Sequence, residues 1–354
     1  MSDLIHPGQI LQSTLEHRSM TQKDVALRLG MTEKQVNFII NGKAPITPQT
    51  AQRLEYAVGV KAHFWNNLQK NYDQALAKLE FEEELNHEIN LLKDFTCYNQ
   101  LAEHGYVDQT KNIKEKLSSL LEFFGHTSLC NVSRLAGVNY RKSDDDKFND
   151  KNICAWLRIG DIDANKMEVK PFNRSKLLDT IPQIRQLTQS SPSEYSPSLV
   201  NILAECGIAL IYTPYLTQTY INGASRWLSP TRALIQLSTR HKSNDALWFT
   251  LMHELGHILK HGKKDEFIDF ASKSSDAQEG EADSYALETL IPTNEYKSFV
   301  MQQDFSKENI VRASNIMGIG SDILAGRLAH DNFINWALKQ QLSIKIELKK
   351  PVKL

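Results

Sequence analysis

The order of apolar and polar residues along the chain predicts mostly helices, interrupted by one short region of strands. Residues 1–75 contain short amphipathic stretches separated by Gly and Pro, a pattern typical of a small helical bundle. The runs 207–213 and 233–239 are short and apolar enough to be buried strands. Helical patterning then returns, and an alternation at 343–348 indicates one late strand. The predicted fold class is therefore mainly α with a small β-sheet, an α+β fold.

A change in patterning divides the chain into four predicted parts. The run 142–151 is charged and has no apolar period, so a boundary is expected there. We expect an all-α domain at 1–75, a helical connector at 76–150, a domain that contains the predicted buried strands at 151–300 and a helical subdomain at 301–354.

The first part contains a predicted helix-turn-helix. Thr21 and Thr32 can each begin a helix, and Gly30 between them suits the left-handed turn that joins such helices. The second helix would offer four polar residues to the major groove of double-stranded DNA: Thr32, Lys34, Gln35 and Asn37. Gln and Asn can pair with adenine, and Lys can reach guanine or phosphate. The alternative is a helical bundle used only for dimerisation.

The sharpest chemical signal is the motif His253-Glu254-x-x-His257. Two His residues four positions apart lie on one face of a helix, so both imidazoles can bind one Zn²⁺. The Glu254 carboxylate can take a proton from a zinc-bound water, whose pKa the metal lowers to near 7. Apolar neighbours predict a central helix, which Asn244 and Asp245 can cap. Buried His and Glu side chains are costly unless they are paired or bind a metal.

A catalytic zinc needs a third protein ligand and one open position. We expect that ligand on a helix at 276–290, which Pro292 ends. Glu279 and Asp283 share one face of this helix, so Glu279 can bind the metal while Asp283 accepts a hydrogen bond from the outer ring nitrogen of a ligating His. Glu281 is rotated by ~200° from Glu279, so both cannot bind, and the facing argument favours Glu279. One zinc ion per chain is expected.

Two more His residues are candidates for the site. His261 continues the four-residue spacing but drifts from the motif's face. It is either a ligand or, as we favour, a solvent-facing group or an outer partner of the ligands. His330 can be a positioned donor to an oxyanion, although a surface histidine is the simpler interpretation.

Composition narrows the class of protein. With 354 residues, 41% of them hydrophobic, the chain can form two or three folded units. Its 41 Lys and Arg against 42 Asp and Glu exclude a uniformly basic surface but allow a local basic patch. The first 20 residues do not resemble a signal peptide, no stretch is suited to span a membrane, and the four Cys residues are widely spaced. We therefore expect a cytoplasmic protein with no membrane contact.

The first 75 residues resemble the HigA-type antitoxin branch of the Xre family. The resemblance is carried by three stretches: His6–Leu11, Met20–Ala26 and Ile40–Thr47. Those proteins are dimeric repressors. The resemblance therefore implies a homodimer formed through the N-terminal domain and a palindromic DNA operator.

Residues 154–336 resemble the ImmA/IrrE family of zinc metallo-endopeptidases. The matching pieces are Ala155–Arg158, Tyr220–Ala224, Trp248–His257, Glu279–Asp283, Leu290–Pro292 and Gly326–Leu328. The resemblance implies a gluzincin-like fold with a small sheet on the metal helix and the ligands His253, His257 and Glu279, with Glu254 as base. Asp283 stands where many members have Asn. It also implies that 221–224 or the strand at 233–237 borders the cleft, where an exposed edge can hold substrate as an added strand.

Two hypotheses for function follow. The first is a DNA-binding zinc metallo-endopeptidase that cleaves a protein partner, such as a transcriptional repressor or a toxin-antitoxin component, with a zinc-bound water activated by Glu254. The second is a non-proteolytic transcriptional regulator or antitoxin whose metalloprotease-like domain senses a signal. An intact Glu254 favours the first, because a closed structural site needs no base.

Overall fold

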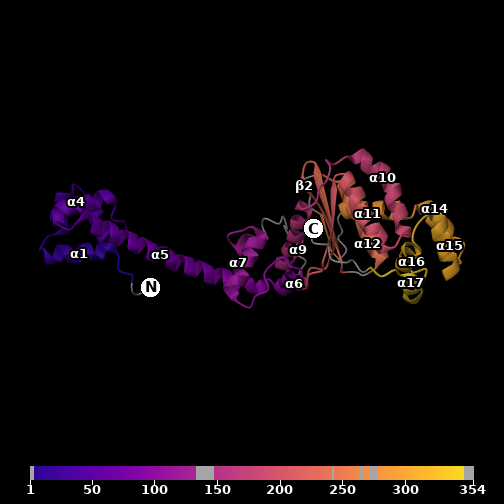
Figure 1. Cartoon of the computed structure of the whole chain (residues 1–354), viewed down its shortest axis with the longest axis horizontal. Helices are drawn as coiled ribbons and strands as arrows, with labels where there is room; N and C mark the ends of the chain where they lie inside the picture. Colours follow the sequence, from indigo (N-terminus) through magenta and orange to yellow (C-terminus); the bar gives the residue numbers. More distant parts are fainter. Residues whose placement is uncertain (1–3, 133–146, 241–242, 263–266, 271–276, 347–354) are drawn as a thin grey trace. The chain divides into compact units, whose positions relative to one another are not determined.

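A computed structural model of the chain forms two compact units, Met1–Asn90 and Leu91–Leu354. The residues that the structure describes are 4–132, 147–240, 243–262, 267–270 and 277–346. Figure 1 shows the elements in chain order. The division into four parts expected from the sequence stays a prediction.

The first unit is built from helices. They are α1 (Pro7–His17), α2 (Gln22–Leu29), α3 (Glu33–Ile40), α4 (Pro48–Val58) and α5 (Ala62–Leu91). Each contributes apolar side chains to one shared core, in which Leu11, Val25, Val36, Leu54 and Trp65 are completely buried. This core holds α2 and α3 in a fixed pair.

The pair α2–α3 begins with the capping boxes that the sequence predicts. At α2, the Asp24 amide donates to Thr21 Oγ1 at 3.1 Å, and the Thr21 amide donates to Asp24 Oδ2 at 3.0 Å. At α3, Thr32 and Gln35 make the same two bonds at 3.3 and 2.9 Å. Gly30 ends α2 with φ +63°, a left-handed conformation that favours glycine. The predicted helix-turn-helix is confirmed.

The second unit surrounds a sheet with helices. Before the sheet come η1 (Leu92–Asp94), α6 (Tyr98–Glu103), α7 (Ile113–Phe124), η2 (Leu129–Asn131), α9 (Asp150–Asn165), α10 (Arg174–Gln186), η3 (Leu187–Gln189) and α11 (Pro192–Glu205). The later helices are α12 (Asn244–Lys260), α13 (Ala277–Leu290), α14 (Thr293–Val300), α15 (Lys307–Met317), α16 (Ser321–His330) and α17 (Trp336–Leu342). Among the described helices, none has both the length and the apolar character that a membrane span requires.

The sheet contains four strands in the order β1-β3-β2-β4. Their bounds are β1 (Ile208–Thr213), β2 (Ile221–Ser229), β3 (Arg232–Ser238) and β4 (Phe267–Phe270). β1 and β3 are parallel, whereas β2 runs antiparallel to both β3 and β4. The predicted mainly α fold with a small sheet is thus confirmed, and β1 and β3 lie within one residue of the predicted runs.

Both faces of the sheet are covered, because successive strand residues point to opposite sides. On one face, Ala209 and Leu234 pack with Ala164 of α9 in a small core. On the other face, Ile208 and Ile235 join the large core formed with α11, α12 and α16. Figure 1 shows α9 on one side of the sheet and α11 and α12 on the other. The sheet thereby fixes α12 through buried apolar contacts.

Two local expectations are wrong in detail. The late strand expected at 343–348 is, within the described residues, an isolated antiparallel bridge between Lys345 and Ser243. Ser243 is also the residue at the N-cap of α12, so the expected cap at Asn244 is displaced by one position. Asn244 is instead fully buried and donates a 2.8 Å hydrogen bond to Asp322 of α16. This hydrogen bond connects the start of α12 to α16.

Candidate functional site

Helix α12 places the two His residues of the motif one turn apart in the interior. His253 is 3% exposed, His257 is 2% exposed and Glu254 is completely buried. The helix is apolar on most of its surface and lies between the sheet and α13, which explains why polar side chains are buried here. The two Nε2 atoms lie 2.9 Å apart.

Helix α13 adds the expected third side chain. Glu279 Oε2 lies 3.2 Å from His253 Nε2, and Glu279 Oε1 lies 3.6 Å from His257 Nε2. One donor atom from each of the three residues falls within 4.8 Å of the other two, so this group can hold a metal ion. The helices approach closely at Gly256, where a Cβ atom would be 3.2 Å from the Ala282 Cα atom.

The charges of this cluster suit a bound cation. Burial by itself raises the pKa of Glu279, but hydrogen bonds from His253 and His257 outweigh burial and hold that pKa at about 2. Burial lowers the pKa of His257, which favours the neutral imidazole that metals bind. A carboxylate and two imidazoles that point at one place match the donor set of catalytic zinc sites, so the residues present fit this metal.

The outer ring nitrogens of the two His residues have different partners. His253 Nδ1 lies 2.9 Å from Asp283 Oδ1, as the spacing predicts. His257 Nδ1 lies 2.9 Å from His261 Nδ1, and His261 Nε2 lies 3.3 Å from Glu281 Oε2. The structure therefore brings His261 to the site as an outer partner.

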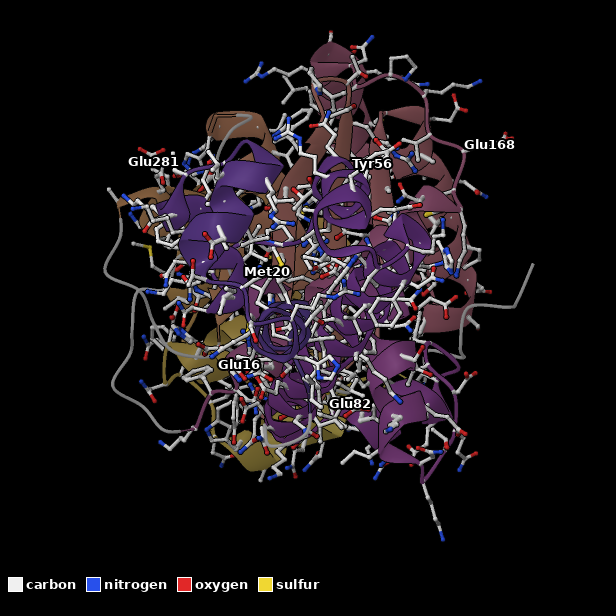
Figure 2. All side chains as sticks on the ribbon, turned by 90° about the vertical axis from the view of Figure 1, so that its left-hand side faces the viewer. Glu16, Met20, Tyr56, Glu82, Glu168 and Glu281 are labelled. Carbon is white, nitrogen blue, oxygen red and sulfur yellow. The ribbon has the colours of Figure 1, made fainter. Side chains whose placement is uncertain are left out.

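Glu281 and His330 do not join the metal-binding group. The Glu281 side chain is 60% exposed, and Figure 2 shows it at the periphery of the molecule. The expected rotation around α13 therefore separates it from Glu279. The His330 side chain is 71% exposed and its ring contacts Asp331, so the structure gives no support to a role at an oxyanion.

Glu254 lies against β2, at the segment 221–224, which was one of the two segments expected beside the cleft. A Cβ atom on Gly223 would be 2.7 Å from Glu254 Oε1 and 2.6 Å from Thr250 Cγ2. Pairing of β2 with β4 shifts register beside Asn222, and such irregularities are common near active sites. The sequence did not single out Gly223 as the residue in contact, because the run around it alternates poorly between polar and apolar residues.

The sheet edge expected beside the cleft is covered. Residues 233–237 lie in β3, which pairs with β1 and β2 on its two sides. Residues 221–224 lie in β2, which pairs with β3 and β4. Neither segment is an edge, so the expectation of an exposed edge is wrong, whereas Gly223 of the first segment does lie beside Glu254. In the described part of the sheet, the edges are β1 and β4.

The four residues expected to contact DNA are all exposed and lie at or on α3. Thr32 and Gln35 form the capping box at the start of that helix. Asn37 Nδ2 donates to Gln22 Oε1 of α2 at 3.3 Å, which connects the two helices of the motif. Lys34 extends from the same exposed surface. The structure therefore presents this set together on one unit.

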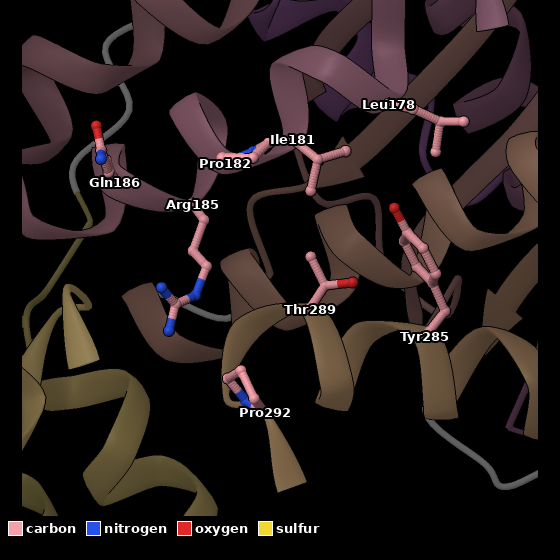
Figure 3. A pocket seen from close by; sticks show the side chains of 8 residues that line it. All are labelled: Leu178, Ile181, Pro182, Arg185, Gln186, Tyr285, Thr289 and Pro292. Carbon is pink, nitrogen blue, oxygen red and sulfur yellow. The ribbon is translucent and has the colours of Figure 1, made fainter. Parts of the chain in front are cut away.

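A separate pocket of about 470 Å³ lies between α10 and α13 (Figure 3). Leu178, Ile181 and Arg185 line it from α10, and Tyr285 and Thr289 line it from α13. Arg185 Nε donates to the Leu290 carbonyl at 3.0 Å, so its cation is already engaged with the end of α13. None of the lining residues belongs to the metal-binding group.

Two family models match the chain. Residues 205–319 match the Peptidase M78 model, described as an IrrE N-terminal-like domain. Residues 11–65 match a helix-turn-helix model. The first match contains α12 and α13, and the second contains α2 and α3.

Relatives and one solved structure match shorter parts of the chain. The HTH-type transcriptional regulator YddM of Escherichia coli is 27% identical over 78 residues, which cover 22% of this chain and 83% of the relative. Virulence-associated protein I of Dichelobacter nodosus is 33% identical over 75 residues, which cover 21% of this chain and 69% of the relative. The structure of a HigA-family addiction module antidote protein from Coxiella burnetii is 34% identical, with a TM-score of 0.22, and covers 24% of this chain and 94% of that chain.

The two family-model matches agree with the two groups of residues found in the structure. The paired helices with their capping boxes lie in the helix-turn-helix match, and the His–His–Glu group lies in the Peptidase M78 match. The chain therefore carries an Xre-like helix-turn-helix domain in its N-terminal unit and an IrrE-like Peptidase M78 domain in its C-terminal unit.

Proposed function

We propose that this protein is a DNA-binding zinc metallo-endopeptidase that cleaves a protein partner. The observation that carries the proposal is the convergence of His253, His257 and Glu279 next to a fully buried Glu254. Three ligands of this kind leave a position open for reaction, and a carboxylate adjacent to them is the base that peptide hydrolysis needs. A structural metal site would need no such carboxylate.

The ligands would be the Nε2 atoms of His253 and His257 and a carboxylate oxygen of Glu279, with one zinc ion per chain. When bound there, Zn²⁺ lowers the pKa of a coordinated water to near 7 and polarises the peptide carbonyl. Asp283 accepts the hydrogen bond from His253 Nδ1 and so keeps the His253 Nε2 lone pair directed at the site.

Glu254 is proposed to move the protons. Its carboxylate takes a proton from the attacking water and delivers it to the departing amine nitrogen. Gly223 leaves room for this carboxylate under β2, since any side chain there would approach Glu254 Oε1 within 2.7 Å. Burial excludes bulk water from the carboxylate and strengthens its electrostatic effect.

The N-terminal unit is proposed to bind an operator in double-stranded DNA as a homodimer, through Thr32, Lys34, Gln35 and Asn37. The family match to helix-turn-helix proteins supports DNA binding. The protein substrate is proposed to be a transcriptional repressor or a toxin-antitoxin component, which places the reaction in the cytoplasm. A DNA-binding domain in the same chain raises the local concentration of the protease near targets that are bound to DNA.

A single variant tests the proposal. Wild type and Glu254→Gln are expressed in the same bacterial host, and new protein N-termini are identified by mass spectrometry. We expect N-termini that depend on the wild type and that fall by about 10²–10⁴-fold in the variant. Zinc content and binding to DNA fragments selected from a random library should not change. The same N-termini in both strains, or none with wild type, would contradict proteolysis.

The second candidate is a regulator that binds a signal and cleaves nothing. The observation in its favour is the pairing of β2 with β4, which covers the strand edge next to Glu254. In that case Glu254→Gln would leave regulation unchanged.

A further inference from the structure

The two metal-facing His residues are supported in different ways on their outer sides. His253 Nδ1 contacts a carboxylate directly, at 2.9 Å from Asp283. His257 Nδ1 contacts a second imidazole, His261, which in turn lies 3.3 Å from Glu281. A neutral imidazole donates from one ring nitrogen and accepts at the other, so the direction of the hydrogen bond between the two rings depends on their tautomers.

The tautomers follow from the direction of the metal-facing atom. If His257 Nε2 offers its lone pair to a metal, the proton of that ring is on Nδ1. His257 Nδ1–H then donates to His261 Nδ1, which must be unprotonated. The proton of the neutral His261 ring is therefore on Nε2, from which it donates to Glu281 Oε2. Each hydrogen bond in the series His257–His261–Glu281 then has one donor and one acceptor, and the last acceptor is a carboxylate.

The backbone at the end of α12 turns His261 into this position. His261 is the C-cap residue, with φ −106° and ψ 169°, and its amide still donates to the His257 carbonyl at 3.0 Å. Although the helix has ended, the His261 side chain is only 4% exposed. A solvated surface histidine would not be enclosed in this way. Glu281 remains 60% exposed, so its charge stays hydrated.

We propose that His261 is a positioning residue that orients His257 for metal binding, with Glu281 holding the His261 tautomer. The inference rests on the proposed zinc site and deepens it. It assigns different roles to two of the carboxylates of α13, since Glu279 binds the metal and Glu281 acts through two imidazoles. His261 then has the same role toward His257 that Asp283 has toward His253.

Two substitutions separate positioning from packing. In His261→Asn, Oδ1 replaces Nδ1 at the same number of bonds from the backbone, so the acceptor for His257 is kept. In His261→Gln, the amide lies one bond further out and the acceptor is lost. We expect His261→Gln to weaken zinc binding by about 10–100-fold. His261→Asn should stay within about threefold of wild type, as should the control His330→Ala.

Zinc affinity of the full chain is measured by competition with a chromophoric chelator, and thermal unfolding of the metal-free proteins controls for folding. Should His261→Gln not fold, His261→Leu also lacks the acceptor and takes its place. In the zinc-loaded wild type, ¹⁵N histidine spectra should show His261 protonated at Nε2 and not at Nδ1. The inference would be overturned if both variants lost the same zinc affinity or if His261→Gln lost none. It would also be overturned if His261 were protonated at Nδ1 instead of Nε2. Wild type that binds no zinc would instead overturn the proposed function.

Discussion

The helix-turn-helix and the metal-binding group differ in how far apart along the chain their interacting residues lie. The capping boxes of α2 and α3 join residues three positions apart, such as Thr32 and Gln35. The metal-binding group joins α12 to α13, and His253 meets Asp283 across 30 positions. Local bonds need only a local sequence, whereas the metal-binding group depends on how α12, α13 and the sheet pack. Damage to packing should therefore affect the two regions very differently.

The largest expected effect comes from a side chain placed between β2 and α12. In Gly223→Val, the new atoms would enter the space of Glu254 Oε1 and Thr250 Cγ2 and displace the carboxylate. Misplacement of a reacting group by about 1 Å can cost ~10²-fold, so we expect cleavage to fall at least that much. DNA binding should not change. The measurement is the rate at which the wild-type-dependent N-termini appear.

The matched control for this variant is a second glycine in the same unit. Among the residues that the structure describes, no atom outside the adjoining backbone of α13 lies within 4 Å of a Cβ atom placed on Gly280, so Gly280→Ala should keep full activity. Equal activity of Gly223→Val and wild type would show that the contact between β2 and Glu254 is unimportant for the reaction.

The next effect concerns the pH dependence of stability in the second unit. Burial raises the pKa of Asp322 to about 6, opposed by the hydrogen bond from Asn244 and assisted by the Asp245 charge. Between pH ~4 and ~6 the native state then binds a proton that the unfolded state has released, so the free energy of unfolding falls as pH rises. We expect a loss of roughly 2–3 kcal/mol across this window from this group.

Denaturant unfolding at several pH values measures this effect in wild type and Asp322→Asn. The difference between the two proteins should change across the window, because the Asn side chain does not titrate. Parallel curves would exclude a buried Asp322 with a raised pKa. Amide exchange in α3 should show no corresponding change.

The smallest effect is expected in the N-terminal unit. Thr32→Ala removes the side-chain acceptor for the Gln35 amide and should cost about 1 kcal/mol. Thr21→Ala does the same at α2 and is the matched control. Amide exchange in α2 and α3 measures both losses. Only Thr32→Ala should also weaken DNA binding, and neither variant should alter zinc affinity. Equal DNA binding by the two variants would argue against contact by Thr32.

The difference between local and long-range contacts also decides what could be predicted. The helix-turn-helix was predicted in detail, because Thr21, Gly30 and Thr32 act on residues next to them. The motif around His253 was visible because both imidazoles lie on one helix. Glu279 could be favoured over Glu281 by helix geometry alone. In each case the relevant contacts repeat at a known spacing.

The rest depended on packing that no spacing describes. Strand β2 contains Asn222, Gly223 and the buried Arg226, so its alternation of polar and apolar residues is poor. Strand β4 has only four residues. The enclosed position of His261 follows from the backbone turn after α12, which periodicity could not indicate.

The zinc content of the purified protein shows directly whether His253, His257 and Glu279 form a metal site. Wild type, His253→Ala, Glu279→Ala and the exposed control His330→Ala are purified identically and analysed by mass spectrometry of the metal. We expect about one zinc per chain in wild type and in His330→Ala. Zinc binding should be lost or much weakened in His253→Ala and Glu279→Ala. Zinc retained by Glu279→Ala would contradict the assignment of Glu279 as a ligand. No zinc in any preparation, even after reconstitution, would contradict the proposal that the protein is a zinc metallopeptidase.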